Sequence, residues 1–170
     1  MSTPAMTRAQ ASLEMALWHA DAEAMSSSDL YVWLRESGLP PEIAIRLKEL
    51  VGFTAKVGTK VVSLGKIILV KLFEFIKKHQ NLAVGMALGA AIASIVSSVP
   101  ILGPILAPIV LPLGIIVGAI AGHRVDKAND HRINGDTSLV SLTQDVIEIA
   151  REFFELFVDT MRAVSDEISI

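Results

Sequence analysis

The chain has 170 residues, of which 52% are hydrophobic and 19% are charged. This apolar excess excludes an intrinsically disordered protein, and the length allows one domain. The net charge of -3 is too balanced for a nucleic-acid-binding protein, which would carry a clustered basic excess, so no nucleic-acid partner is expected. Cysteine is absent, which excludes disulfides, thiolate zinc sites and thiol nucleophiles.

The charge is unevenly distributed along the chain. Residues 51–80 carry six lysines and one glutamate, residues 79–123 carry no formal charge, and residues 137–170 carry two arginines and seven acidic residues. We therefore predict an all-α fold in which amphipathic helices flank a central Gly/Ala/Pro-rich hydrophobic helical hairpin. The predicted segments are a short-helix N-terminal bundle at 1–52, a basic amphipathic helix at 53–80, a hydrophobic, transmembrane-competent hairpin at 81–122, a polar linker at 123–136, and an acidic amphipathic helix at 137–170.

The N-terminal segment reads as short helices with defined ends. Ser26 supplies a side-chain acceptor at a helix start, Gly38 suits a left-handed residue after a helix, and Pro41 suits the first turn of the next helix. Trp18 and Trp33 are predicted to pack between these helices. The first 30 residues lack the continuous apolar run of a signal peptide, so secretion by that route is not expected.

Residues 54–78 have the pattern of a basic amphipathic helix. At 100° per residue the lysines share an arc of about 140°, and apolar residues occupy the opposite side. The lysines could face the headgroups of an anionic bilayer, or they could form the solvated face of an ordinary bundle helix. The membrane-surface interpretation assigns this role to Lys56, Lys60, Lys66, Lys71, Lys77 and Lys78.

The uncharged segment is too long for one buried helix. One crossing of a bilayer needs ~20 apolar residues, so the segment fits two arms, about 81–97 and 105–122, joined by a turn near 97–104. Basic residues flank the hairpin on both sides, and the positive-inside rule then places both termini in the cytoplasm. We expect a membrane location, with a soluble form before insertion as a further option.

Each arm has small residues at intervals of four. Such residues let helix backbones approach closely in lipid, either between the two arms or between subunits, and we expect a homo-oligomer. The predicted packing residues are Gly85, Gly89, Ala93 and Ser97 in the first arm, and Gly114, Gly118 and Gly122 in the second.

Four prolines recur with the same interval: Pro100, Pro104, Pro108 and Pro112. In a helix each would fail to donate to the carbonyl four residues back, and lipid cannot satisfy a free carbonyl. This pattern indicates a kinked or extended hairpin tip, or carbonyls that face water or a neighbouring helix in a pore. A third interpretation makes 100–112 a loop that enters the membrane.

Histidines lie at both ends of the hairpin. His123, Asp126 and Asp130 would share a helix face, but the alternating charges around them indicate a solvated helix end, so no metal site is predicted. Protonation of His79 and His123 near pH 6 to 6.5 would add charge at the base of the hairpin.

The last predicted helix carries apolar residues at 3.5-residue spacing, which is typical of a bundle or coiled-coil seam. They are Leu139, Leu142, Val146, Ile149, Phe153 and Leu156. An acidic face formed by Asp145, Glu148, Glu152, Glu155 and Asp159 could pair with the lysines of 54–78.

No catalytic motif is found. The sequence contains no phosphate-binding loop, no zinc-protease or hydrolase motif and no dinucleotide fingerprint, so we predict neither an enzyme nor a cofactor.

The uncharged hairpin between amphipathic helices resembles pore-forming colicin domains and proteins of the apolipoprotein-L type over about residues 54–168. The resemblance is one of architecture and includes no specific motif. It implies a chain that can pass from a compact helical state to a membrane-inserted one. The leading hypothesis is a membrane-inserting helical protein that oligomerises through its small residues and permeabilises the bilayer. The partner is then a lipid bilayer, and an anionic bilayer is one version of this hypothesis. The alternatives are a membrane-anchored adaptor that binds a protein partner through 1–50 or 137–170, and a soluble assembly that buries the hairpin.

Overall fold

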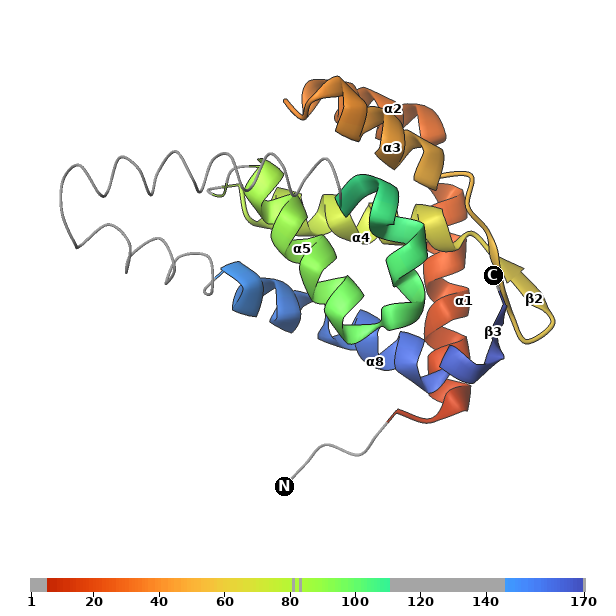
Figure 1. Ribbon diagram of the computed structural model, residues 1–170. Helices are drawn as coiled ribbons and strands as arrows, with labels where there is room; N and C mark the ends of the chain where they lie inside the picture. Colours follow the sequence, from red (N-terminus) through yellow and green to blue (C-terminus); the bar gives the residue numbers. More distant parts are fainter. Residues whose placement is uncertain (1–5, 81, 83, 111–145, 170) are drawn as a thin grey trace, which may run out of the picture. The chain divides into compact units, whose positions relative to one another are not determined.

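The computed structural model of the chain describes residues 6–80, 82, 84–110 and 146–169 (Figure 1). They are mostly helical and include a small three-stranded sheet, so the broad all-α prediction is confirmed with that addition. The helices are α1 (Arg8–Ala24), α2 (Ser27–Glu36), α3 (Pro41–Leu50), α4 (Leu64–Lys78), α5 (Val84–Ser98) and α8 (Glu155–Ala163), with 3-10 turns η1 (Pro100–Leu102) and η2 (Ser165–Glu167) and further helical residues at 103–110 and 146–153. The strands are β1 (Ala55–Val57), β2 (Lys60–Val62) and β3 (Ile168–Ser169).

The chain divides into two units, each described by itself. The first comprises residues 1–74 with 155–170, and the second comprises residues 75–154. The first unit therefore joins the N-terminal helices to the end of the chain.

The ends of the N-terminal helices are set by the residues that the sequence indicates. The Ser26 hydroxyl accepts a hydrogen bond from the Ser28 N–H at 3.2 Å at the start of α2. Gly38, beyond the end of α2, has φ 81°, a conformation that glycine adopts without steric cost. Pro41 is the first residue of α3. The predicted helix ends are confirmed.

Aromatic side chains hold the first unit together. Trp18 of α1 is buried, with its ring centroid 5.6 Å from that of Phe157 of α8. Trp33 of α2 meets Phe73 of α4 edge-on at 4.6 Å. Both geometries are favourable for aromatic pairs. The prediction that the two tryptophans are packing residues is confirmed.

Residues 55–62 form a β-hairpin, so the prediction of one basic helix from 53 to 80 is wrong over this part. Val57 pairs with Lys60 across a two-residue turn, and Gly58 begins that turn with φ 64°. Both turn types favoured in such hairpins need positive φ at this position, and the β-branched valines of the strands suit extended backbone. The lysine spacing that suggested a helix is therefore divided between two strands and a shorter helix, α4.

The end of the chain returns to this hairpin as a third strand. β3 pairs antiparallel with β1, giving the sheet order β2-β1-β3, with Lys56 opposite Ser169 and Val57 opposite Ile168. Arg8 at the start of α1 forms ion pairs with Asp166 and Glu167 of η2. The predicted helix over 137–170 is correct for α8 and wrong for the residues after it.

The second unit contains an aromatic cluster around Phe75. Its ring centroid lies 4.6 Å from that of His79, 5.3 Å from that of Phe153 and 5.5 Å from that of Phe154. The His79 Nδ1 atom is 3.0 Å from the Phe75 carbonyl oxygen. These contacts bring the residues before the apolar segment together with residues that follow it in the sequence.

The apolar segment begins with α5, which ends at Ser98 near the predicted turn. The 3-10 turn η1 follows, and helical backbone resumes at residue 103. Residues 111–145 lie outside the described part of the chain, as do most of the predicted second arm and the linker at 123–136.

A close backbone contact requires glycine at position 65. A Cβ there would lie 1.8 Å from the Leu50 carbonyl oxygen and 2.8 Å from the Phe53 Cβ. We expect Gly65→Ala to lower the free energy of unfolding by about 1–3 kcal/mol, because backbone atoms must move to admit the methyl group. Urea unfolding measures this change. Gly85→Ala is the matched control, since nothing lies within 4 Å of its added Cβ, and an equal loss in the control would contradict the explanation.

Candidate functional site

The two sides of α5 differ in burial. One side is buried in the second unit and carries mainly larger apolar residues and alanines, namely Ala87, Leu88, Ala91, Ile92 and Ile95. On the other side Gly85 and Gly89 are half-buried, and Ala93 and Ser97 are exposed. The described members of the predicted small-residue ladder therefore share an accessible helix face. Gly114, Gly118 and Gly122 lie outside the described residues.

Ser94 is a polar residue on the buried side of α5. It is 1% exposed, and its hydroxyl has no hydrogen-bond partner among the residues that the structure describes. Leaving a buried hydroxyl unpaired costs roughly 1–3 kcal/mol. The described conformation therefore places a destabilising group in the middle of the apolar segment.

The described prolines of the second ladder are all exposed. Pro100 begins η1, and its carbonyl oxygen accepts a hydrogen bond from the Gly103 N–H, so this carbonyl is not free in the described conformation. Pro104 lies in the first turn of the helical residues 103–110, where proline is tolerated. Pro108 lies further along and cannot donate to the Pro104 carbonyl. Pro112 lies outside the described residues.

Two of the predicted membrane-surface lysines are engaged within the first unit. Lys66 is only 7% exposed. The Lys71 Nζ atom lies 4.7 Å from the centre of the Trp18 ring and 3.8 Å from a Glu74 carboxylate oxygen. A cation over an indole face is electrostatically stabilised. Both of these α4 lysines are therefore largely covered within the first unit.

The other four lysines lie on different elements. Lys56 and Lys60 are exposed on β1 and β2, while Lys77 and Lys78 are exposed at the end of α4. The Lys78 Nζ atom lies 5.7 Å from the centre of the Phe153 ring. The six lysines therefore do not share one helix, contrary to what the helical periodicity predicted.

Lys66 belongs to a polar cluster at the junction of β2 and α4. The Ser63 hydroxyl donates a hydrogen bond to the Glu23 carboxylate, and the Ser63 N–H donates to His19 Nδ1 at 3.2 Å. The hydrogen bond from Ser63 is the main reason that the pKa of Glu23 lies below its ordinary value of 4.5. Desolvation is the next largest effect and raises this pKa, while the weaker attractions to Lys66 and His19 lower it further. The cluster ties α1 to the start of α4.

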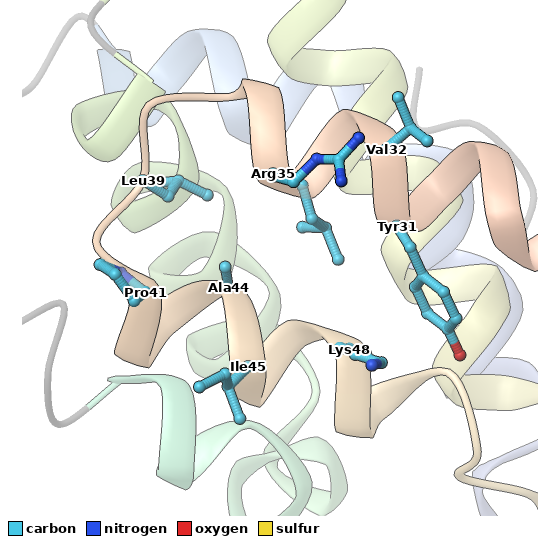
Figure 2. A pocket seen from close by; sticks show the side chains of 9 residues that line it. Tyr31, Val32, Arg35, Leu39, Pro41, Ala44, Ile45 and Lys48 are labelled. Carbon is cyan, nitrogen blue, oxygen red and sulfur yellow. The ribbon is translucent and has the colours of Figure 1, made fainter.

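A groove that the sequence did not reveal lies between α2 and α3 in the first unit. Its volume is about 420 Å³, and Figure 2 shows side chains from both helices around it. The groove is lined by Tyr31, Val32, Leu34, Arg35, Leu39, Pro41, Ala44, Ile45 and Lys48. The sequence indicates this groove only through apolar residues that lie away from the buried faces of two short helices. Helical periodicity alone does not distinguish such residues from ordinary apolar surface residues.

In the described part of the chain, no group of His, Asp and Glu side chains is placed to hold a metal ion. His123, Asp126 and Asp130 lie outside the described residues. No helix that the structure describes is both long enough and apolar enough to span a membrane.

The Glu23 hydrogen bond predicts a pH dependence of stability. Because the folded-state pKa is lowered, the stabilisation is complete above the unfolded pKa and is lost as the pH falls through the folded pKa. Glu23→Gln should therefore lower stability at pH 7, and the difference from the unmodified chain should narrow below about pH 4.5. Thermal unfolding at several pH values measures this, with Glu36→Gln as the exposed control. A difference that persists unchanged to pH 3 would contradict the assignment.

Comparison of the chain with protein-family models, with curated proteins and with solved structures found no match.

Proposed function

We propose that the chain is a membrane-inserting helical protein whose apolar segment, residues 81–122, enters the bilayer as a hairpin with both termini cytoplasmic. In this proposal it oligomerises through its small-residue ladders and permeabilises the membrane. The observation that carries the proposal is the accessible face of α5, on which Gly85, Gly89, Ala93 and Ser97 recur within a segment that has no charge.

This face has the composition of a helix interface in lipid. Between helices in a bilayer the hydrophobic effect gives little attraction, so association depends on close van der Waals packing, which small side chains allow. Glycine in an exposed helix costs up to about 1 kcal/mol relative to alanine. Packing against a second helix would offset that cost at Gly85 and Gly89.

Ser94 supports the existence of a second conformation. Its unpaired hydroxyl destabilises the conformation described above. Between helices in a membrane, serine commonly donates a hydrogen bond to a neighbouring helix. Insertion that gives the Ser94 hydroxyl such a partner would therefore be favoured, because the free-energy cost of the buried, unpaired hydroxyl would be removed.

The prolines support a role at the tip or in a pore. Pro108 leaves the Pro104 carbonyl without its helical donor, and both residues are exposed. In a bilayer this carbonyl needs water or another polar group. A water-lined opening, or the hydrated surface at the tip of the hairpin, would supply it.

A second candidate is the membrane-anchored adaptor, which the groove between α2 and α3 favours. An apolar groove outside the hydrophobic segment is suited to holding another protein segment. In that case the hairpin would be an anchor, and the chain would bind membranes without releasing their contents.

Flotation and dye release measured together test the leading proposal. The purified chain is added to dye-loaded liposomes made with and without anionic lipid, and we expect it to float with the liposomes and release the dye. Gly89→Leu and Gly118→Leu should each weaken assembly and slow release, because leucine separates the helix backbones.

Ala107→Leu, which places the same side chain at an exposed residue outside the ladder, is the control. If both glycine variants assemble and release dye as the unmodified chain does, the ladder argument fails. Flotation without release would favour the adaptor, and absence of flotation would overturn the membrane proposal.

Ser94→Ala tests the second conformation. Removing the unpaired hydroxyl should raise the free energy of unfolding by roughly 1 kcal/mol and slow dye release, because the uninserted state gains stability. Ser97→Ala is the matched control, since the Ser97 hydroxyl is exposed and donates to the Ser94 carbonyl oxygen at 3.1 Å. A lower unfolding free energy for Ser94→Ala would show that this hydroxyl is stabilising in the folded chain.

A further inference from the structure

We propose that the groove between α2 and α3 of one copy of the chain binds the exposed face of α8 of a second copy. We call this face, formed by Glu155, Leu156 and Asp159, the acidic ridge. The contact joins two different surfaces, so it is head-to-tail. Both surfaces lie outside the apolar segment, and the inference does not rest on the proposed membrane function.

The groove is apolar with a cation on each helix. Val32 on α2 and Ile45 on α3 are 42% and 55% exposed, which is unusual exposure for aliphatic side chains gathered in one place. Arg35 extends from α2 and Lys48 from α3, as Figure 2 shows, and no carboxylate lines the groove. The groove therefore suits an apolar group accompanied by negative charge.

Neither cation is neutralised within the described part of the chain. Arg35 has no carboxylate partner there, and the Lys48 Nζ atom lies over the Tyr31 ring, 4.9 Å from its centre. A cation over an aromatic ring keeps donors free for an anion. Both walls can therefore receive a carboxylate.

The openness of the groove favours a macromolecular occupant. A pocket for a small molecule typically buries most of its ligand, whereas Val32 and Ile45 on the two walls of this groove remain about half exposed. A helix that enters such a groove brings its own polar face to cover the rim. A flat bilayer surface would not fill a concave site.

The acidic ridge has the complementary pattern. Leu156 is 48% exposed, while Phe157 and Met161 of the same helix are buried. Glu155 and Asp159 are exposed beside Leu156, and neither forms an ion pair with a described residue. The ridge thus presents one large apolar side chain between two carboxylates, which matches an apolar groove between two cations.

Within one copy of the chain, the acidic ridge does not occupy the groove. α8 packs against α1 through Trp18 and Phe157, and Leu156 remains exposed in the chain, as do Val32 and Ile45 of the groove. A second copy can bring the ridge to the groove without disturbing that packing. Each added copy leaves one free groove and one free ridge, so association can continue or close into a ring.

Charge reversal in the full chain, studied by sedimentation without lipid, tests the contact. Arg35→Glu and Asp159→Arg should each weaken self-association by about tenfold or more, because each places like charges across the contact. The two single variants mixed together should associate again, and so should the double variant, since both restore opposite charges. A loss of folding would not be reversed in this way.

Two further variants test the apolar part and its specificity. Leu156→Ser should weaken association, while Leu13→Ser, at another exposed leucine on α1, should not. Lys60→Glu, an exposed charge reversal on β2, is the matched charge control. The inference is overturned if the chain is monomeric, if Arg35→Glu and Lys60→Glu weaken association equally, or if the double variant stays dissociated.

Discussion

The contact between α1 and α8 is the interaction on which the first unit depends. Stacking of Trp18 on Phe157 brings the two ends of the sequence together, and pairing of β3 with β1 continues the same connection in the sheet. Long-range contacts of this kind carry a large entropic cost of loop closure, which buried aromatic surface must offset. Arg8 contributes little to that balance, because its ion pairs with η2 are exposed.

The absence of charge over residues 79–123 imposes a different constraint on the second unit. There is no charged side chain to mark a solvent face of α5. Its leucine and isoleucines are buried together with several alanines, while the more accessible side carries Gly85, Gly89, Ala93 and Ser97. A helix built in this way is compatible with two surroundings, a protein core on one side and a closely packed helix on the other. This double compatibility underlies the membrane proposal.

The sequence allowed prediction of features that depend on local chemistry. Helix ends at Ser26, Gly38 and Pro41 follow from capping and backbone preference, and the break near Ser98 follows from the prolines. It did not allow prediction of β3, since a two-residue strand exists only through its partner. Nor did it reveal the groove, because the exposure of Ile45 depends on how two helices meet.

The late position of β3 has a consequence for synthesis of the chain. β1, α4 and the apolar residues up to 110 are made before α8 and β3, so the contact between α1 and α8 cannot form while those residues emerge from the ribosome. Exposed apolar surface on a nascent chain attracts chaperones and membranes. Under the membrane proposal, the order of elements along the chain gives the apolar segment a period in which it can meet a bilayer before the first unit closes.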